Sequence, residues 1–262
     1  MNAPFEVVEL RRYVLHPGRR DDLIEIFEHR FVESQEACGM TPFGHYRDLD
    51  DPNAFVWLRG FPRMETRAAA LAAFYGSPYW TDHRDLANAT MVDSDNVLLL
   101  RSARPGSGFD LQGLHRLSPS EASASTSLVA LAVFMLERAA DDASIAAFEA
   151  TVLPQLRACA QRVALLVTEE RPNDFPRLPV REGEYAFVAA GVCPTPDALA
   201  RWRTVLTGDH LTDGLGPKRR ELRGAPPRTG SSLSLPLTVD PGVSAVPRLG
   251  AQRRPTLRST AV

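Results

Sequence analysis

The sequence is nearly free of lysine and contains few cysteines. Of its 30 basic residues, Lys218 alone is a lysine, and this bias towards arginine is more typical of genome composition than of a mechanism. Cys38, Cys159 and Cys193 lie far apart and form no Cys-x-x-Cys pair. Such spacing argues against a disulfide framework or a zinc knuckle, and it fits a reducing compartment.

Long hydrophobic runs and an export signal are also missing. The longest apolar run, 128–136, is too short to cross a bilayer as a helix. A strand pattern begins at Glu6, which leaves no room for a signal peptide before it. We therefore expect a cytoplasmic protein that has no contact with a membrane.

Motifs of the common nucleotide, hydrolase and metal sites are absent as well. The segment 105–108 (Pro-Gly-Ser-Gly) lacks the flanking strand and helix of a phosphate-binding loop, and no Gly-x-Ser-x-Gly occurs. Glu25, Glu28 and His29 lie on the polar stripe of a predicted helix, at a spacing that gives no metal-binding pair. We expect no bound metal and no cofactor.

The charge is small overall but unevenly distributed. From Leu215 to Val262, nine basic residues face two acidic ones, so this end carries +7 and the net charge of −2 requires −9 on the rest. A basic end suits nucleic acid, but no aromatic residues interleave its arginines as base stacking requires. The favoured interpretation is a poorly ordered, solubilising tail at residues 241–262, and no nucleic-acid partner is expected.

The first 104 residues predict one β-α-β-β-α-β unit. Val8, Leu10 and Val14 alternate with polar residues as in a half-buried strand, and the Ser77-Pro78 step is typical of a helix start. Turn residues at 50–53 separate two strands of a hairpin. The predicted elements are a strand over 6–15, a helix over 21–39, strands over 43–48 and 54–61, a helix over 64–75, a short helix from 78, and a strand over 96–101.

After a Ser- and Pro-rich stretch at 105–126, which is typical of a linker, the pattern repeats. The second copy, at 127–240, is offset by roughly 130 residues, which indicates an internal duplication. Its predicted elements are a strand over 128–136, a helix headed by Asp141 and Asp142, strands over 163–168 and 185–192, a helix over 198–206, and a closing strand with Leu233, Leu235 and Leu237. The predicted fold class is therefore α+β, with duplicated ferredoxin-like units.

Several short motifs in the first half, taken together, resemble one known family. They are Glu9-Leu10-Arg11-Arg12-Tyr13 followed by His16-Pro17-Gly18, Gly44-His45-Tyr46-Arg47, Asp51-Pro52-Asn53, Trp57-Leu58-Arg59-Gly60-Phe61, Glu65-Thr66-Arg67-Ala68-Ala69, and Ser77-Pro78-Tyr79-Trp80. In this order and spacing, the stretch from Glu6 to Arg101 is similar to the NIPSNAP family. The second half has Ala130-Leu131-Ala132-Val133-Phe134 where the first motif would stand, so its assignment rests on the pattern alone.

The resemblance implies a dimeric α/β-barrel, in which two ferredoxin-like units set their sheets face to face. With two units in one chain, the barrel can close within the monomer or across a homodimer, and we expect a homodimer. The family has no defined reaction. Proteins of this architecture include cofactor-free oxygenases, haem-degrading enzymes and small isomerases, but such likeness is a weak basis for chemistry.

Aromatic and polar residues alternate on the predicted strands in a way that suggests a small-molecule pocket. If the alternating sets share one sheet face, they build an apolar cavity with a few convergent polar groups, as small-molecule sites do. His45 is the candidate general base, and an arginine could hold a carboxylate or enolate oxygen. The candidate ligand-binding residues are Arg11, Tyr13, His45, Arg47, Trp57 and Trp80.

A plainer interpretation of the same residues stays open. Glu9, Arg11 and Arg47 could form cross-strand ion pairs at a subunit interface while the aromatic residues are core, and for the residues themselves this interpretation is favoured. The function that follows is either binding of a small organic molecule, as a cofactor-independent oxygenase or isomerase, or non-catalytic assembly through the sheet faces. An open cavity would support the first, and a filled core the second.

Overall fold

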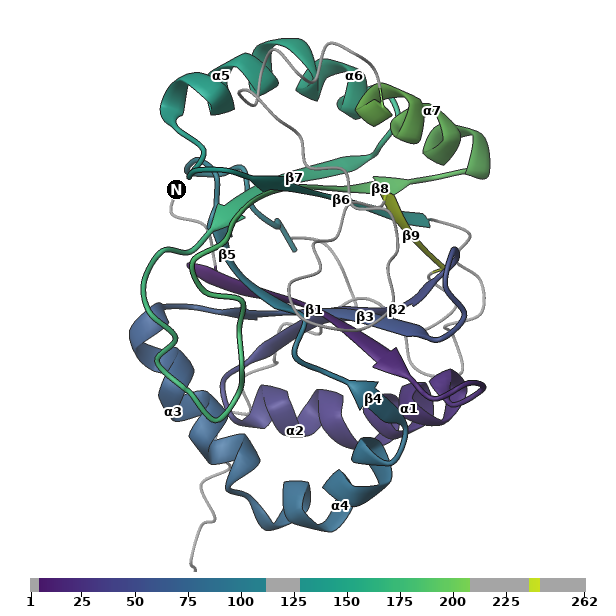
Figure 1. Cartoon of the computed structure of the whole chain (residues 1–262), viewed down its shortest axis with the longest axis vertical. Helices are drawn as coiled ribbons and strands as arrows, with labels where there is room; N and C mark the ends of the chain where they lie inside the picture. Colours follow the sequence, from purple (N-terminus) through teal and green to yellow (C-terminus); the bar gives the residue numbers. More distant parts are fainter. Residues whose placement is uncertain (1–4, 112–127, 208–235, 241–262) are drawn as a thin grey trace, which may run out of the picture.

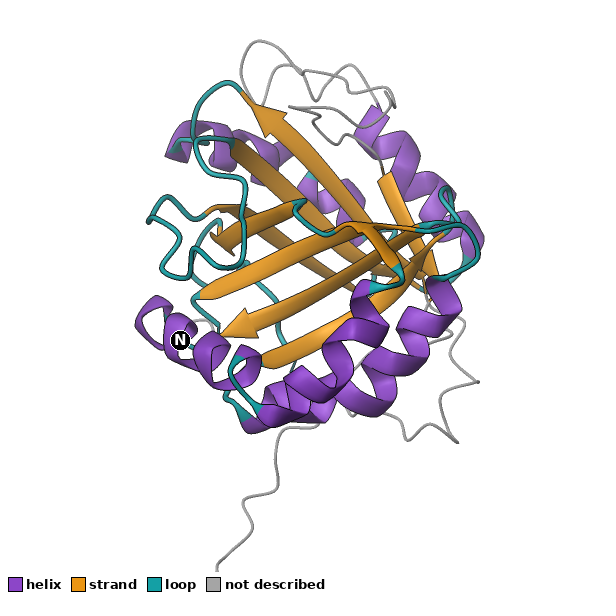
Figure 2. Ribbon diagram, turned by 60° about the horizontal axis from the view of Figure 1, so that its bottom comes forward, coloured by secondary structure: helices purple, strands orange, loops and turns teal. Residues whose placement is uncertain are grey.

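The structure, a computed structural model, describes residues 5–111, 128–207 and 236–240. Its strands form a curled central sheet that lies between two groups of helices (Figures 1 and 2). Helices of the first half cover one side, and helices of the second half cover the other (Figure 1). The order of layers is thus helix, sheet, sheet, helix.

Each half of the chain contributes one unit of alternating strands and helices. The elements of the first unit are β1 (Val7–Leu15), α1 (Arg20–Ile26), the π-helical turn η1 (Phe27–Phe31), α2 (Val32–Ala37), β2 (Thr41–Asp48), β3 (Ala54–Phe61), α3 (Met64–Tyr75), α4 (Pro78–Asn88), β4 (Met91–Asp93) and β5 (Val97–Ser102). Those of the second unit are β6 (Leu128–Leu136), α5 (Asp142–Thr151), α6 (Leu153–Arg157), β7 (Arg162–Thr168), β8 (Tyr185–Cys193), α7 (Pro196–Thr207) and β9 (Pro236–Asp240). The predicted α+β, ferredoxin-like fold class is confirmed.

Most predicted elements of the first unit are present, with two exceptions. The predicted cap at Ser77 is found, because its Oγ accepts a hydrogen bond from the Trp80 N–H at 3.0 Å. The predicted helix over 21–39 is interrupted by the π turn η1, and the short strand β4 was not predicted. A π turn inserts one residue into a helix and therefore changes which side chains face the sheet beyond it.

The strands close into a barrel within this one chain. Pairing runs from β1 to β3, β2, β9, β6, β8, β7 and β5, and β5 pairs with β1 again. The pairing pattern of the second unit repeats that of the first, since β6, β7 and β8 pair as β1, β2 and β3 do. This repetition is what an internal duplication produces, and it settles which of the two forms of barrel closure occurs.

The two units differ in the connection between their second and third strands. In the first unit β2 and β3 are joined by residues 49–53, whereas β7 and β8 are joined by residues 169–184. We call the latter the 169–184 loop. It leaves the second unit and lies against the first, where Phe175 and Leu178 pack on the first unit's core.

The apolar core has three parts. Two lie between the sheet and the helices of each unit, around Trp57 in the first and Trp202 in the second. The third lies inside the barrel and joins residues of both units, such as Leu10 and Val188. Both sheet faces are therefore covered within the chain, which removes the expected use of exposed sheet faces for assembly.

A β-bulge corrects the predicted facing of one residue. Strict alternation along the predicted strand would place Phe43, His45 and Arg47 on one face, but the register of β2 shifts between Pro42 and Gly44. Phe43 consequently faces the barrel interior, while His45 faces the helices. The Phe43 ring lies across Gly60, where an added Cβ would meet it at 2.4 Å, so this close approach requires glycine.

The first part of the predicted linker is packed rather than free. The Ser107 carbonyl accepts a hydrogen bond from the Leu165 N–H at 2.7 Å, and Phe109 packs on Phe43 with ring centroids 5.0 Å apart. The rest of the linker, the basic tail at 241–262 and two of the closing-strand leucines, Leu233 and Leu235, lie outside the described residues. Within the described ranges, no helix is both long and apolar enough to cross a membrane.

Candidate functional site

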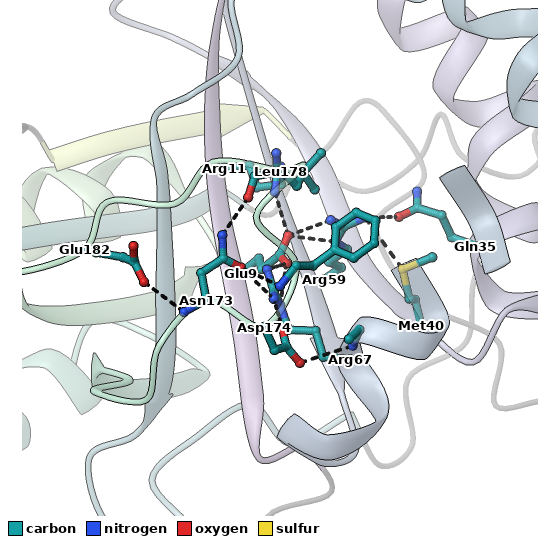
Figure 3. Close-up of polar contacts among 12 residues, drawn as sticks. Glu9, Arg11, Gln35, Met40, Arg59, Arg67, Asn173, Asp174, Leu178 and Glu182 are labelled. Atoms are coloured by element: carbon teal, nitrogen blue, oxygen red, sulfur yellow. Dashed lines mark hydrogen bonds and ion pairs between the residues drawn. The ribbon is translucent and has the colours of Figure 1, made fainter. Parts of the chain in front are cut away.

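Charged side chains lie buried between the first unit's sheet and its helices. Glu9 and Arg11 alternate along β1 on the face that also carries Tyr13, as the sequence predicts. Arg59 of β3 lies directly opposite Glu9, and Arg67 approaches from α3 (Figure 3). None of the four charged side chains is more than 2 % exposed. We call Glu9, Arg11, Arg59 and Arg67 the arginine cluster.

One carboxylate holds the three guanidinium groups together. Glu9 Oε2 accepts hydrogen bonds from Arg11 Nη1 at 2.7 Å and from Arg59 Nε at 2.8 Å. Glu9 Oε1 accepts from Arg67 Nε at 2.9 Å. Charge-assisted hydrogen bonds of this kind are about twice as strong as neutral ones, so Glu9 is the centre of the cluster.

Neutral side chains accept further hydrogen bonds from two of the guanidinium groups. Arg59 Nη1 donates to Gln35 Oε1 at 3.0 Å, and Arg11 Nε donates to the Tyr13 hydroxyl at 2.8 Å. The Trp57 ring lies against both arginines, with the Arg59 and Arg11 guanidinium carbons 5.0 and 5.5 Å from its centroid. The indole N–H of Trp57 is buried and has no hydrogen-bond partner among the described residues.

The 169–184 loop of the second unit covers the cluster at Arg67 (Figure 3). Arg67 Nη1 donates to Asn173 Oδ1 at 3.0 Å and to the Asp174 carboxylate. The other oxygen of Asp174 accepts from the Ala68 N–H at 3.2 Å. Phe175, the next residue of the loop, stacks on Tyr75 with centroids 6.3 Å apart.

Electrostatics keep Glu9 ionised although it is fully buried. Burial alone would raise the pKa of Glu9, but Arg59, Arg11 and Arg67 outweigh it and hold this pKa well below the ordinary value of 4.5. Burial raises the pKa of Tyr13 despite the neighbouring Arg11, so the phenol stays protonated. With three arginines against Glu9 and Asp174, the charges of this region sum to +1.

The structure brings four of the predicted site residues into one region. Arg11, Trp57 and His45 form one row across β1, β3 and β2. Since neighbouring strands lie about 4.8 Å apart, the Arg11 and His45 backbones are separated by about 10 Å. Tyr13 lies beside Trp57, with ring centroids 6.1 Å apart.

His45, the candidate base, is enclosed. Its Nε2 lies 3.4 Å from Glu28 Oε1 on the π turn η1, and the imidazole is 2 % exposed. The Phe27 ring packs on both His45 and Trp57, with centroids 5.4 and 4.7 Å away. Phe27 thus fills the space that the predicted pocket would need above these two residues.

The two other predicted residues lie elsewhere. Arg47 is at the surface, where it pairs with the Asp21 carboxylate rather than with Glu9. Trp80 packs on Phe31, Phe74 and Tyr75, at centroid distances of 5.2, 5.4 and 4.8 Å. Both side chains lie outside the arginine cluster, and neither is part of the proposed site.

Besides Glu9, which the sequence suggested only as an ion-pair partner, four residues of the site were not among the predicted ligand-binding candidates. Arg59 could have been found, because it follows Trp57 by two positions on the same strand face. For Arg67, the only indication in the sequence is that an arginine stands within a mainly apolar helix. Asn173 and Asp174 gave no signal, since they stand in a loop more than a hundred positions away from their partner.

A cavity of about 300 Å³ lies between β5 and the 169–184 loop, and no residue of the arginine cluster belongs to its wall. Leu99 of β5 belongs to its wall, and Leu99 is the cross-strand neighbour of Glu9. Most of the other wall residues belong to the loop or its two ends, among them Thr168, Arg171 and Tyr185. Movement of this loop would therefore change both the cavity and the cover of Arg67.

The second unit has an apolar surface at the corresponding place. Ala130 and Ala132 hold the positions in β6 that Glu9 and Arg11 hold in β1, and the partner of Ala130 is Gly191, as that of Glu9 is Arg59. The Trp202 ring lies on Gly191, where an added Cβ would meet it at 2.4 Å. The same fold is thus built with a packed tryptophan in one unit and a charged cluster in the other.

Comparison with known proteins agrees with the motifs of the first unit. A family model described as NIPSNAP matches residues 8–103. An uncharacterised NIPSNAP-like domain protein from Burkholderia xenovorans is 25% identical over 39% of this chain and 91% of its own, with a TM-score of 0.35. A NIPSNAP family protein of unknown function from Agrobacterium tumefaciens is 19% identical over 39% of this chain and 93% of its own, with a TM-score of 0.36.

A longer match is a candidate monooxygenase from Fusobacterium nucleatum, which is 8% identical over 80% of this chain and 83% of its own, with a TM-score of 0.47. Comparison with curated proteins finds no match. The family resemblance of the motifs is confirmed by the family model, which matches residues 8–103 of this chain.

Proposed function

We propose that the first unit binds a small organic anion at the arginine cluster. The observation that carries this proposal is the excess of buried positive charge, since three arginines with almost no exposed surface meet one buried carboxylate and the partly exposed Asp174. A buried charge without a full set of counter-charges is costly. An anionic ligand would neutralise this excess, and arginine suits the flat, two-pronged shape of a carboxylate.

Stability alone is a poor explanation for such a cluster. Replacement of a buried ion cluster by well-packed apolar residues is often neutral or stabilising. The second unit has an apolar arrangement at the matching place, with Ala130, Gly191 and Trp202. The charges of the first unit are therefore best explained by a task other than holding the fold together.

A cofactor-independent oxygenase or isomerase is the reaction class that this arrangement would serve. Such reactions pass through an enolate or a related anion, which guanidinium groups stabilise as its charge develops. His45 is the nearest candidate base, in line with Arg11 and Trp57 on the sheet. A substrate reaching both would have to lie over the Trp57 ring and displace Phe27.

The alternative, a non-catalytic assembly protein, would use a different surface from the one expected. Leu86 of α4 and Val92 of β4 are 61% and 55% exposed, which is high for apolar side chains in a folded unit. If assembly is the function, Leu86→Ser with Val92→Ser would lower the molecular mass in solution. Under the anion-binding proposal these two changes leave ligand binding intact.

Thermal unfolding in the presence of small anions tests the proposal. Acetate, benzoate and succinate would be compared with chloride at equal ionic strength. Since a ligand that binds the folded state alone stabilises it, a saturating anion should raise the Tm by about 5 °C or more. The proposal fails if none of the organic anions exceeds chloride.

Two arginine variants make the test specific. Arg67→Gln removes one guanidinium of the cluster and should abolish the shift relative to its own ligand-free Tm. Arg12→Gln is the matched control, because Arg12 is on the same strand as Arg11 and pairs with Asp51 at 2.7 Å, outside the cluster. A shift that survives Arg67→Gln would place the anion elsewhere.

A further inference from the structure

Asp174 meets the arginine cluster in the way a free carboxylate would. One of its oxygens accepts from Arg67 Nη1, and the other accepts from the Ala68 backbone N–H at 3.2 Å. Asn173 adds its amide oxygen to the same Arg67 nitrogen at 3.0 Å. Arg67 Nη1 and the Ala68 N–H are thus two donors that bind one carboxylate, and the chain supplies this carboxylate itself.

Asp174 also lies at the solvent-exposed edge of the site. Its side chain is 25% exposed, whereas that of Arg67 is fully buried. If the loop withdrew, Arg67 Nη1 would lose both acceptors, and three arginines would face Glu9 alone. The charge of the opened cluster would be +2, which a ligand with two carboxylates would neutralise.

We propose that Asp174 occupies the subsite of a ligand carboxylate, and that the ligand is a small dicarboxylate whose binding displaces the 169–184 loop. This inference rests on the proposed function, since it names the class of anion and the event that admits it. One carboxylate of the ligand takes the place of Asp174 on Arg67 and the Ala68 N–H. The second meets the remaining charge of the cluster at Arg11 and Arg59.

The contacts of the loop suit such an exchange. Arg181 N–H donates to the Val97 carbonyl at 2.9 Å and Glu169 N–H to the Leu99 carbonyl at 2.8 Å, so both ends are fixed on β5. Between them, the loop is held to the first unit by polar contacts and by Phe175 and Leu178, which pack on the edge of the first unit's core. The tip can therefore leave Arg67 while the ends stay paired, with Gly183 in a left-handed conformation beside the second end.

Calorimetric titration of succinate, with acetate as the monocarboxylate probe, tests the inference. Asp174→Asn keeps the shape of the side chain but weakens its hold on Arg67, so succinate should bind the variant about 5-fold more tightly or better than the wild type. Glu170→Gln is the matched control, because it removes one carboxylate from the same loop away from the cluster, and it should change the affinity little. Equal affinities of wild type and Asp174→Asn would overturn the inference.

Hydrogen exchange of the wild type gives a second readout. The Phe175 N–H donates to Asn173 Oδ1 at 3.1 Å, and the Asn173 N–H donates to Glu182 Oε1 at 2.8 Å. Saturating succinate should speed exchange at both amides if the loop is displaced. Slower or unchanged exchange overturns displacement.

The two proposals can fail separately. If succinate and acetate bind the wild type with equal affinity, and binding depends on Arg67 but not on Asp174, the anion site stands and the dicarboxylate inference is wrong. If neither anion binds the wild type or Asp174→Asn, both proposals are wrong.

Discussion

At the scale of single residues, Glu9 is the counter-charge that the three buried arginines share. It is the shared acceptor of Arg11, Arg59 and Arg67, and no other carboxylate of the described residues contacts all three. Removal of one partner from a buried ion cluster leaves the rest uncompensated, which costs far more than the loss of a surface pair. The charge on Glu9 is therefore a condition for the cluster to fold as it does.

Glu9→Gln should lower the free energy of unfolding by about 3–5 kcal/mol, because it leaves three buried arginines without their counter-charge. Urea unfolding followed by circular dichroism measures this loss. Glu170→Gln, at an exposed loop position, should stay within about 0.5 kcal/mol of the wild type. A loss below about 1 kcal/mol for Glu9→Gln would mean that the cluster contributes little to folding.

The depressed pKa of Glu9 also predicts a pH dependence. A carboxylate whose pKa is lowered on folding stabilises the native state above its ordinary pKa, 4.5, and this contribution is lost as the pH falls towards the folded-state value. Below about pH 4.5 the wild type should therefore lose about 1.4 kcal/mol per pH unit through this group. Glu9→Gln should show a shallower acid slope, and identical slopes would contradict the assignment.

The sequence predicted part of this site because the strand period is reliable. Alternation placed Glu9, Arg11 and Tyr13 on one face, and the structure agrees. It could not predict that Arg47 would pair with Asp21 at the surface, since such pairing depends on where α1 lies. It also gave no indication of Asp174, whose approach to Arg67 requires the tertiary arrangement of the two units.

At the scale of elements, local irregularities decide what each strand and helix presents to the site. The π turn η1 begins at Phe27, whose ring packs on His45 and Trp57, and the bulge in β2 sends Phe43 into the barrel. Regular periodicity predicts neither, because each inserts one residue into an otherwise regular pattern. The ends of β3, in contrast, are marked by Pro52 and Pro62, and this strand was predicted to the residue.

The fit of α7 on β8 gives a prediction for the second unit. Gly191→Ala would place a Cβ about 2.4 Å from the Trp202 ring, so overpacking should cost about 1–3 kcal/mol of stability. In a Trp202→Leu background, which removes the ring, the same change should cost clearly less. Urea unfolding measures the stability of each variant. If the losses of the two single variants simply add in the double variant, the contact with the Trp202 ring is not the reason why Gly191→Ala is unfavourable.

At the scale of the whole molecule, the barrel is completed by two units of one chain. β2 pairs with β9 and β5 pairs with β7, so each unit supplies the edges that the other needs. Closure of the barrel thus does not require the predicted homodimer. The homodimer stays a prediction, and so do the domain boundaries at residues 104 and 127. The duplication was visible in the sequence because each unit repeats the same order of elements.

Residues 1–104 alone should not remain a monomer. Without the second unit, the edges of β2 and β5 and the barrel-facing side chains of Val8, Leu10 and Leu58 would be exposed. Free edges and apolar surface drive association, so this fragment should form dimers or larger species. Light scattering during gel filtration measures the mass, and a stable, folded monomer would contradict the role assigned to the second unit.

The most direct test of anion binding at the arginine cluster uses the tryptophan indole resonances. The chain has three tryptophans, and Trp57 alone lies against the cluster, while Trp202 in the second unit is an internal reference. In a ¹H–¹⁵N titration of the full chain with succinate, the Trp57 indole peak should shift in the wild type and stay fixed in Arg67→Gln, with Trp202 unchanged in both. A Trp57 peak that does not move at saturating succinate, or that moves equally in Arg67→Gln, would contradict the account.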